Sequence, residues 1–216
     1  MTWLARPVAA ALTTFTALLL AACATPGNPA GTGGDGPGAP DPAALADHLA
    51  PAADGEVIGQ GTVLQGGDAP PAFCLGGVME SYPPQCSGPP IMNWDWDLAG
   101  GFDSASGVTW GAYAVTGTWD GATFTRTGVP IPLSLYDAMP FDDPLAGRQG
   151  LTAPHELERI QQEVFSGRKG HVLTAGTDRG FVVVTVVYDD GTFQARMDAE
   201  YGADVVVVLS ALRAYG

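Results

Sequence analysis

The first 22 residues constrain this chain most, because they have the three parts of a secretory signal and would be removed before the protein folds. Arg6 is the only charged side chain among them, Val8 to Leu20 is an apolar stretch, and two small residues follow. The stretch is shorter than the ~20 apolar residues that a transmembrane helix needs, and Pro- and Gly-rich sequence comes directly after it. We therefore predict a cleaved signal peptide over residues 1–22 rather than a membrane span.

The sequence Leu20-Ala21-Ala22-Cys23 closely resembles the lipobox of bacterial lipoprotein signals, which has a leucine and two small residues before the cysteine. The resemblance implies that Cys23 becomes the mature N-terminus and carries a diacylglycerol thioether. Each buried methylene contributes about 0.8 kcal/mol, so two or more acyl chains anchor a protein stably. We expect an extracytoplasmic protein that is held on the cell membrane by this N-terminal lipid.

Basic residues are scarce in this chain. It has 9 Lys and Arg against 23 Asp and Glu, and no Lys or Arg lies between Arg6 and Arg126. Nucleic-acid affinity depends on Lys and Arg replacing counterions, and the attraction to anionic lipid headgroups depends on basic residues too. The composition therefore excludes nucleic-acid binding and leaves membrane attachment to the lipid.

Two cysteines remain once Cys23 is lipidated. Cys74 and Cys86 form an even pair in an oxidising compartment, so we predict a disulfide between them. Closing a loop of this length contributes about 3 kcal/mol in the chain-entropy model. A two-cysteine metal site is the alternative, but the three histidines lie elsewhere in the sequence. We predict no metal and no other cofactor.

Composition divides the chain into five segments. Gly, Pro and Ala dominate the sequence after Cys23, which cannot bury enough apolar surface to offset its ordering entropy and should be a flexible spacer. A short helix after Asp41 ends this spacer. The predicted segments are a signal peptide (1–22), the lipidated spacer with its helix (23–54), a β domain (55–140), a turn-rich connector (141–150) and an α+β domain (151–216).

Short β runs separated by Gly and Pro fill residues 55–140, which favours a small OB-like β-barrel pinned by the disulfide; a β-sandwich is the alternative. Asp120-Gly121 lies between two strand-like runs and predicts a hairpin with a two-residue turn. That turn would place Gly117 opposite Phe124, whose ring would cover the glycine. The expected strands are Val57–Leu64, Ala72–Leu75, Ile91–Asp97, Val108–Trp119 and Ala122–Val129.

Residues 151–216 predict a layer with the element order α-β-β-α-β, which resembles half of a ferredoxin-like fold. A helix from a Thr152 cap to Ser166 carries one apolar face. Residues 189–204 fit either a hairpin or a helix, and the helix is chosen because a parallel strand needs a crossover of this length. The helix face comprises Leu157, Ile160, Val164 and Phe165; the strands are His171–Ala175, Phe181–Tyr188 and a central Val205–Leu212, with a turn over Gly176–Gly180.

Trp94 and Trp96 lie beside three acids, Asp95, Asp97 and Asp103, and together suggest a glycan site with stacking rings and paired carboxylates. In a strand, however, the tryptophans would point to one face and Asp95 and Asp97 to the other. We therefore expect tryptophans inside and acids outside. The same acids mimic the start of a calcium loop, but the later ligand positions of an EF-hand are missing; a looser Ca²⁺ contact stays open.

No catalytic constellation is recognisable. The chain has no Gly-x-Ser-x-Gly sequence, a disulfide would consume the free thiols, and His155-Glu156 lacks the second histidine of a zinc protease because residue 159 is arginine. We expect a non-catalytic binding or interaction module. An envelope hydrolase that acts on glycan or peptide through carboxylates is the alternative.

Two stretches, Cys74–Trp96 and Val186–Leu212, resemble a recurrent pattern in actinobacterial secreted and lipid-anchored proteins of uncharacterised activity. The resemblance implies an envelope location and supplies no catalytic residues. The residues that carry it are Glu80-Ser81-Tyr82-Pro83-Pro84-Gln85-Cys86-Ser87-Gly88, Trp94-Asp95-Trp96, Val186-Val187-Tyr188-Asp189-Asp190-Gly191, Tyr201-Gly202, Val205-Val206-Val207-Val208 and Ser210-Ala211-Leu212.

The segment between the two cysteines is the natural interaction site, since it is stiff and partly apolar. Its expected partner is another envelope protein; alternatively these residues only cap the barrel. A second route to a partner would be docking of the apolar run Val205–Leu212 as part of an accessory subunit. The candidate interaction residues are Met79, Glu80, Tyr82, Pro83 and Pro84.

Overall fold

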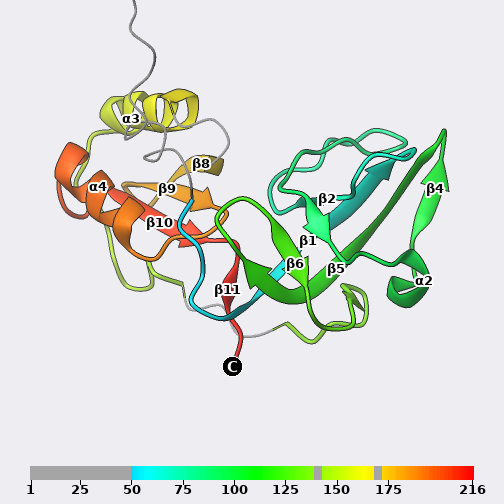
Figure 1. Ribbon diagram of the computed structural model, residues 1–216. Coiled ribbons are helices and arrows are strands. Elements are labelled where there is room, and N and C mark those ends of the chain that lie inside the picture. Colours follow the sequence, from blue (N-terminus) through cyan, green and yellow to red (C-terminus); the bar gives the residue numbers. More distant parts are fainter. Residues whose placement is uncertain (1–49, 139–142, 168–171) are drawn as a thin grey trace, which may run out of the picture. The chain divides into compact units, whose positions relative to one another are not determined.

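Strands dominate the structure, a computed structural model that describes residues 50–138, 143–167 and 172–216 (Figure 1). The predicted signal peptide, Cys23 and the spacer helix lie outside these residues. None of the helices in the described ranges is long and apolar enough to span a membrane. The strands form an eight-stranded sheet and a separate three-stranded sheet.

The larger sheet is built on two long antiparallel strands, β1 and β5, which pair over eleven residues each. Shorter strands pair with their flanks, and the sheet order along its main path is β11-β1-β5-β6-β3. A short helix, α2, lies near one end of the ladder (Figure 1). The elements are β1 (Glu56–Gly66), β2 (Ala72–Cys74), β3 (Ile91–Met92), α2 (Trp96–Ala99), β4 (Asp103–Ala105), β5 (Val108–Trp119), β6 (Phe124–Arg126), β7 (Ile131–Pro132) and β11 (Arg213–Ala214).

Glycines let this sheet curl tightly. Every inward-facing pair between β1 and β5 joins one glycine to one larger residue. A Cβ atom on Gly59 would come within 2.7 Å of the Leu212 side chain, and one on Gly61 would overlap the carbonyl oxygen of Cys74. Because side chains are missing at these positions, neighbouring elements approach the backbone closely. The four pairs are Val57–Gly117, Gly59–Val115, Gly61–Tyr113 and Val63–Gly111.

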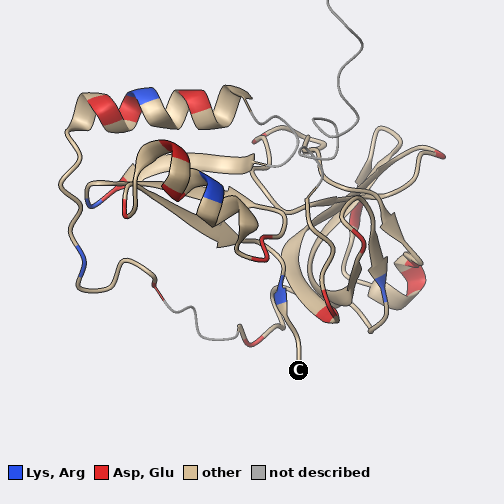
Figure 2. Ribbon diagram, turned by 60° about the vertical axis from the view of Figure 1, so that its left-hand side comes forward, with Lys and Arg blue, Asp and Glu red and all other residues tan. Residues whose placement is uncertain are grey.

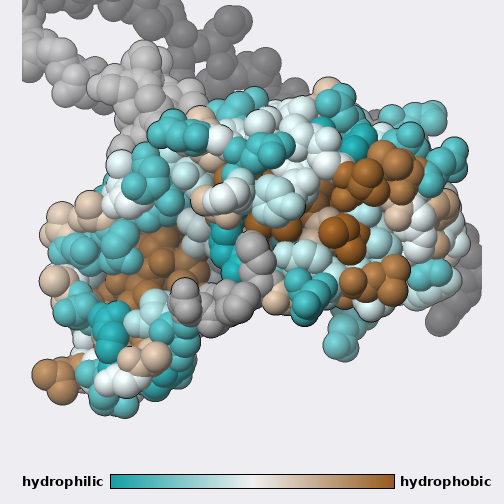
Figure 3. Space-filling view, turned by 90° about the horizontal axis from the view of Figure 1, so that it is seen from below, coloured by the Kyte–Doolittle hydropathy of each residue, from teal (hydrophilic) through white to brown (hydrophobic). Residues whose placement is uncertain are grey.

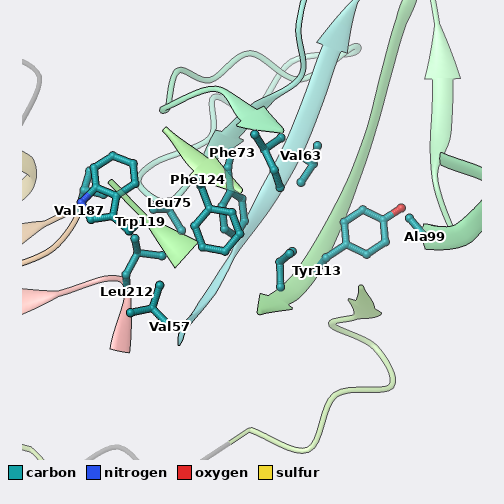
Figure 4. Packing of buried hydrophobic residues seen from close by; sticks show 12 residues of the cluster. Val57, Val63, Phe73, Leu75, Ala99, Tyr113, Trp119, Phe124, Val187 and Leu212 are labelled. Atoms are coloured by element: carbon teal, nitrogen blue, oxygen red, sulfur yellow. The ribbon is translucent and has the colours of Figure 1, made fainter. Parts of the chain in front are cut away.

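The curled sheet forms a half-barrel around an aromatic core (Figure 4). Phe73 and Phe124 are fully buried and their ring centroids lie 5.1 Å apart. Backbone hydrogen bonds cross the open side: the Phe73 N–H donates to the Pro89 carbonyl at 2.8 Å, and the Ile91 N–H donates to the Pro71 carbonyl at 3.0 Å. The prediction of a mainly β protein is confirmed.

The predicted strand Ile91–Asp97 is wrong beyond its first two residues. Asn93 has a φ of 59°, which breaks the extended backbone. Asp95 then caps α2, because its Oδ1 accepts hydrogen bonds from the backbone N–H groups of Asp97 and Leu98. A short polar side chain that binds nearby amides favours a helix start over a strand.

The β5–β6 hairpin is confirmed, but its register differs from the prediction. Trp119 pairs with Phe124, so the loop has four residues instead of two. The Asp120 carboxylate accepts from the N–H groups of Ala122 (2.8 Å) and Thr123 (2.7 Å), which holds the longer turn. Gly117 therefore pairs with Arg126. The Phe124 ring still covers Gly117, since a Cβ there would lie 2.6 Å from it.

The smaller sheet has the predicted order α-β-β-α-β. Its strand order is β10-β9-β8, with β9 and β10 parallel and β8 and β9 antiparallel. β10 is therefore an edge strand, not the expected central one. The elements are α3 (Pro154–Gly167), β8 (Val172–Asp178), β9 (Phe181–Val186), α4 (Thr192–Tyr201) and β10 (Val206–Ser210).

Three details of this layer differ from the expectation. The helix α3 begins at Pro154, and the Ala153 carbonyl accepts the first helical hydrogen bonds, so Thr152 is not the residue before the helix. Phe165 is 53% exposed because it lies off the buried stripe of α3. The β8–β9 turn is confined to Arg179 and Gly180, both with positive φ, and β8 continues through Gly176.

The C-terminal residues join the two sheets. After β10, the N–H of Leu212 donates to the Val187 carbonyl at 2.9 Å, and β11 then pairs with β1. Leu212 is fully buried in the half-barrel core, beside Val187. In Figure 4 both residues lie near Trp119, while Ala99 of α2 lies beside Tyr113 at the opposite end of the cluster. The described residues belong to one compact unit.

Candidate functional site

The predicted disulfide between Cys74 and Cys86 is present. We call residues 74–86 the disulfide loop. Inside it, the Met79 N–H donates to the Gln85 carbonyl at 2.8 Å, and the Ser81 hydroxyl donates to the Pro83 carbonyl at 2.9 Å. The disulfide loop is therefore closed at its base by a covalent bond and held internally by hydrogen bonds.

The side chains near the tip of the disulfide loop face solvent. Tyr82 is 79% exposed, Met79 is 64% exposed, and Glu80 is exposed as well. Pro83 and Pro84 are half-buried. Three of the five candidate interaction residues thus lie freely at the surface, while the two prolines support the loop.

Tyr82 contacts one further aromatic ring, Trp110 of β5, which the sequence prediction did not include. The ring centroids are 5.5 Å apart and the ring planes are perpendicular, at 90°. We call Tyr82 and Trp110 the aromatic corner. Trp110 pairs directly with Leu64 on β1 and with Asp103 on β4, so a carboxylate and an aliphatic side chain lie on either side of the indole.

The surroundings of the aromatic corner are acidic. Glu80 lies two residues from Tyr82, and both Glu80 and Asp103 are exposed. Within the described ranges neither carboxylate makes an ion pair. The first basic residue after Ala50 is Arg126, whose guanidinium donates to the carbonyls of Asn93 and Gly128. Figure 2 shows most of the basic residues on the α3–α4 side of the molecule.

A second aromatic cluster surrounds α2. Trp94 and Trp96 pack edge to face at 5.3 Å, and each also contacts another ring, Tyr113 at 5.1 Å and Phe102 at 5.4 Å respectively. The Trp96 indole donates to Gln65 at 2.6 Å. The Trp94 N–H is buried without a hydrogen-bond partner and lies among aromatic rings, which are weak acceptors.

This second cluster is not an open stacking site. Its two tryptophans are half-buried against the core while Asp95 and Asp97 are exposed, so tryptophans lie inside and acids outside as expected, although not on a strand. The Asp95 carboxylate is occupied as a helix cap. Burial raises the pKa of the Tyr113 phenol, and the Asp103 carboxylate raises it further.

The acids do not converge into a metal site. Among the residues that the structure describes, no three of His, Cys, Asp or Glu lie close enough together to hold an ion. Asp95, Asp97 and Asp103 are therefore not brought together as one group of three ligands.

A cavity of about 560 Å³ lies between the half-barrel and the α+β layer, at the base of the disulfide loop. Its walls are glycines and apolar side chains apart from Ser87, and none of the residues that line it is titratable. The Ser87 hydroxyl therefore has no acidic or basic side chain beside it in this lining. The lining residues are Ala50, Gly76, Gly77, Ser87, Gly88, Pro89, Trp119, Gly121, Ala122, Phe165, Val172, Leu173 and Val187.

Apolar side chains also reach the surface elsewhere. Figure 3 shows a recessed apolar area on the α+β side of the molecule. A groove of about 540 Å³ in that layer is lined by Leu145, Val183 and Leu209. Arg179 at this groove donates to the Leu145 carbonyl and to the Asp143 and Asp178 carboxylates.

Comparisons of this chain with family models, with curated proteins and with solved structures found no match. The chemistry of the aromatic corner therefore has to be inferred from its own residues.

Proposed function

We propose that this protein is a lipid-anchored binding module of the bacterial cell envelope, and that the disulfide loop with its aromatic corner holds an envelope partner. The observation that carries the proposal is Tyr82, a large ring that is 79% exposed on a covalently closed loop. Tyr and Trp are the residues that most often dominate binding energy at interfaces. A loop that is already rigid loses little entropy on binding.

The position of the corner supports this proposal. The described chain enters at residues 50–53, which are fastened to Trp119: the indole donates to the Pro51 carbonyl at 2.9 Å, and the Ala53 N–H donates to the Trp119 carbonyl at 3.0 Å. Trp110 lies nine residues away on the same strand, or about 30 Å at the usual rise of a strand. A tether at one end of β5 leaves the corner at the other end free to reach a partner.

The same proposal includes two finer inferences. The half-barrel is of OB-like type, because β1, β2, β3, β5 and β6 surround one core and small barrels of this type bind ligands on their strand face and loops. The protein also belongs with the actinobacterial envelope proteins that share the Cys74–Trp96 and Val186–Leu212 patterns. No observation favours the alternative of a carboxylate hydrolase over a non-catalytic module.

The lipid anchor is tested by Cys23→Ala in cells. The variant should appear in the medium or accumulate as an uncleaved precursor, and metabolic labelling with a fatty acid should be lost. A variant that stays lipid-labelled contradicts the anchor.

The binding surface is tested by placing a photo-crosslinking amino acid at Tyr82 and irradiating whole cells. Leu151 is the matched control, since it is 99% exposed and lies outside the loop. A discrete adduct from position 82 and none from position 151 is expected. Adding Cys74→Ser and Cys86→Ser should abolish the adduct by loosening the loop. The same adducts from both positions, or none from position 82, would contradict the proposal.

A further inference from the structure

We propose that the partner is a polypeptide which inserts an Arg or Lys side chain into the aromatic corner. This inference rests on the proposed function and names the chemistry of the partner. Three observations lead to it: the right angle between the rings of Tyr82 and Trp110, the unpaired carboxylates beside them, and the absence of basic residues from this part of the chain.

The ring geometry suits a cation. Tyr82 and Trp110 pack edge to face, with perpendicular planes and centroids 5.5 Å apart, so the ring that contributes its edge keeps both of its faces free of the other ring, and Tyr82 is 79% exposed. Cations bind over ring faces within about 6 Å of the centroid, and tryptophan is the best such partner. The part of the chain that the structure describes contains a contact of this kind, since the Arg148 guanidinium lies 4.9 Å from the Phe181 ring centroid.

The charges beside the corner favour the same ligand. Asp103 is the direct cross-strand neighbour of Trp110, and Glu80 lies two residues from Tyr82 on the loop. Neither carboxylate makes an ion pair within the described residues, and residues 50–125 contain no Lys or Arg. A cation from a partner would therefore meet ring faces and carboxylates that no internal cation occupies.

Other classes of partner fit less well. Anionic polymers are repelled by the same carboxylates. A neutral glycan would gain hydrogen bonds from these carboxylates but no ion pairing, and Trp94 and Trp96 add no second stacking surface because other aromatic rings pack against them. A cationic side chain is the ligand that uses both the rings and the charge.

The test measures binding of acetylated and amidated hepta-arginine to the full-length lipoprotein in neutral detergent, by calorimetry. The dissociation constant should rise with salt. Tyr82→Ala should raise it about two- to fivefold, as expected for an exposed cation–π contact, while Tyr82→Phe, which keeps a ring, should bind nearly as the parent does. Asp103→Asn should weaken binding more than Glu158→Gln, which removes the same charge from α3.

The outcomes separate this inference from the proposed function. Equal binding by the parent and by Tyr82→Ala would mean general charge attraction and would overturn the inference. The inference would also be overturned if hexameric N-acetylglucosamine bound in a Tyr82-dependent way and hepta-arginine did not. The proposed binding surface would still stand in that case, because Tyr82 would bind a different ligand. If the proposed function itself is wrong, the photo-crosslinker at position 82 will give no adduct in cells that the control position 151 does not also give.

Discussion

The half-barrel and the α+β layer stabilise their cores in different ways. The half-barrel buries large aromatic rings such as Phe73, Tyr113 and Phe124 in space left by glycines. The layer buries β-branched side chains, among them Val182 and Val184, beneath two helices. Regular elements account for most of the layer, whereas the half-barrel carries a long loop held by a disulfide. The half-barrel thus combines a tightly curled sheet with an exposed loop, while the layer is a regular packed scaffold.

The edges of the smaller sheet are covered. The Gln194 side chain of α4 bonds β10 as a neighbouring strand would: its amide N–H donates to the Val206 carbonyl, and its carbonyl accepts from the Val208 N–H, both at 2.9 Å. Gln161 of α3 donates to the Ala175 carbonyl of β8 at 3.1 Å. These side chains occupy hydrogen-bonding groups that an added strand would need, and so hinder edge pairing with other chains.

The two regions also differ in how their charged side chains are paired. In the layer, Arg159 pairs with Glu156 and Glu163, and Arg179 pairs with Asp143. The arginines lower the pKa of Glu156 and of Asp143. The acids at the aromatic corner have no such partner. The arginines Arg159 and Arg179 of the layer are thus paired internally, while the carboxylates at the aromatic corner face solvent.

The largest expected effect comes from filling a glycine of the half-barrel. Gly61→Val should prevent folding or cost at least about 3 kcal/mol, because the new side chain overlaps the backbone of Cys74. Gly176→Val on β8 is the matched control: no atom lies within 4 Å of its Cβ position. Chemical denaturation followed by tryptophan fluorescence measures both variants. Equal stability of the two variants would contradict the prediction that the half-barrel tolerates a side chain at its glycine less well than the smaller sheet does.

Leu212→Ala should cost about 2–5 kcal/mol, since a fully buried leucine leaves a cavity. Leu212 comes from the C-terminal segment but packs in the half-barrel, so hydrogen exchange should accelerate in both sheets. Leu209→Ala, at a half-buried position of β10, should have a smaller effect. Faster exchange in the layer alone would show that the two cores are independent.

Gln194→Glu should destabilise the layer by about 1–3 kcal/mol, because a carboxylate cannot donate to the Val206 carbonyl, which loses its hydrogen bond. The new charge would also face Asp198, which accepts from Gln194. Gln162→Glu on the exposed face of α3 is the control. Thermal unfolding measures the stability of both variants. Size-exclusion chromatography measures whether the β10 edge, once exposed, makes the protein associate. An unchanged melting temperature would contradict this role of Gln194.

Asp120→Ala should give the smallest loss, and one that depends on pH. Hydrogen bonds from the backbone N–H groups of Thr123 and Ala122 hold the pKa of Asp120 below its usual value. A lowered folded-state pKa contributes stability above the unfolded pKa, near 4, and this contribution disappears as the pH falls through the folded pKa. The variant should therefore be less stable than the parent at pH 7 and differ less at pH 2. A constant difference would contradict this assignment.

Local patterns predicted most of the regular structure. The spacing of Phe193, Met197 and Tyr201 with a following glycine predicted α4, and Met197 is fully buried there. The even number of cysteines that remains after the expected lipidation of Cys23 predicted the disulfide. These signals succeed because periodicity and capping act within a few residues.

Two kinds of interaction account for the errors: side-chain hydrogen bonds to the local backbone, and contacts between segments far apart in the sequence. Asp95 and Asp120 bind nearby amides and so change a strand into a helix start and lengthen a hairpin loop. Trp110 meets Tyr82 although the two residues lie 28 positions apart in the sequence, and such a contact is set by the folded arrangement of β5 and the disulfide loop. An outward-facing tryptophan on a strand was the one signal in the sequence that could have pointed to the aromatic corner.

The attachment of Pro51 and Ala53 to Trp119 has a mechanical consequence. Any tension arriving along the chain before Ala50 must first break two hydrogen bonds, those of Pro51 and Ala53 with Trp119. The load then passes to β1, where eleven cross-strand pairs with β5 share it. Cys74 pairs with Thr62 on β1, so the base of the disulfide loop is held by the same strand that takes up the pull.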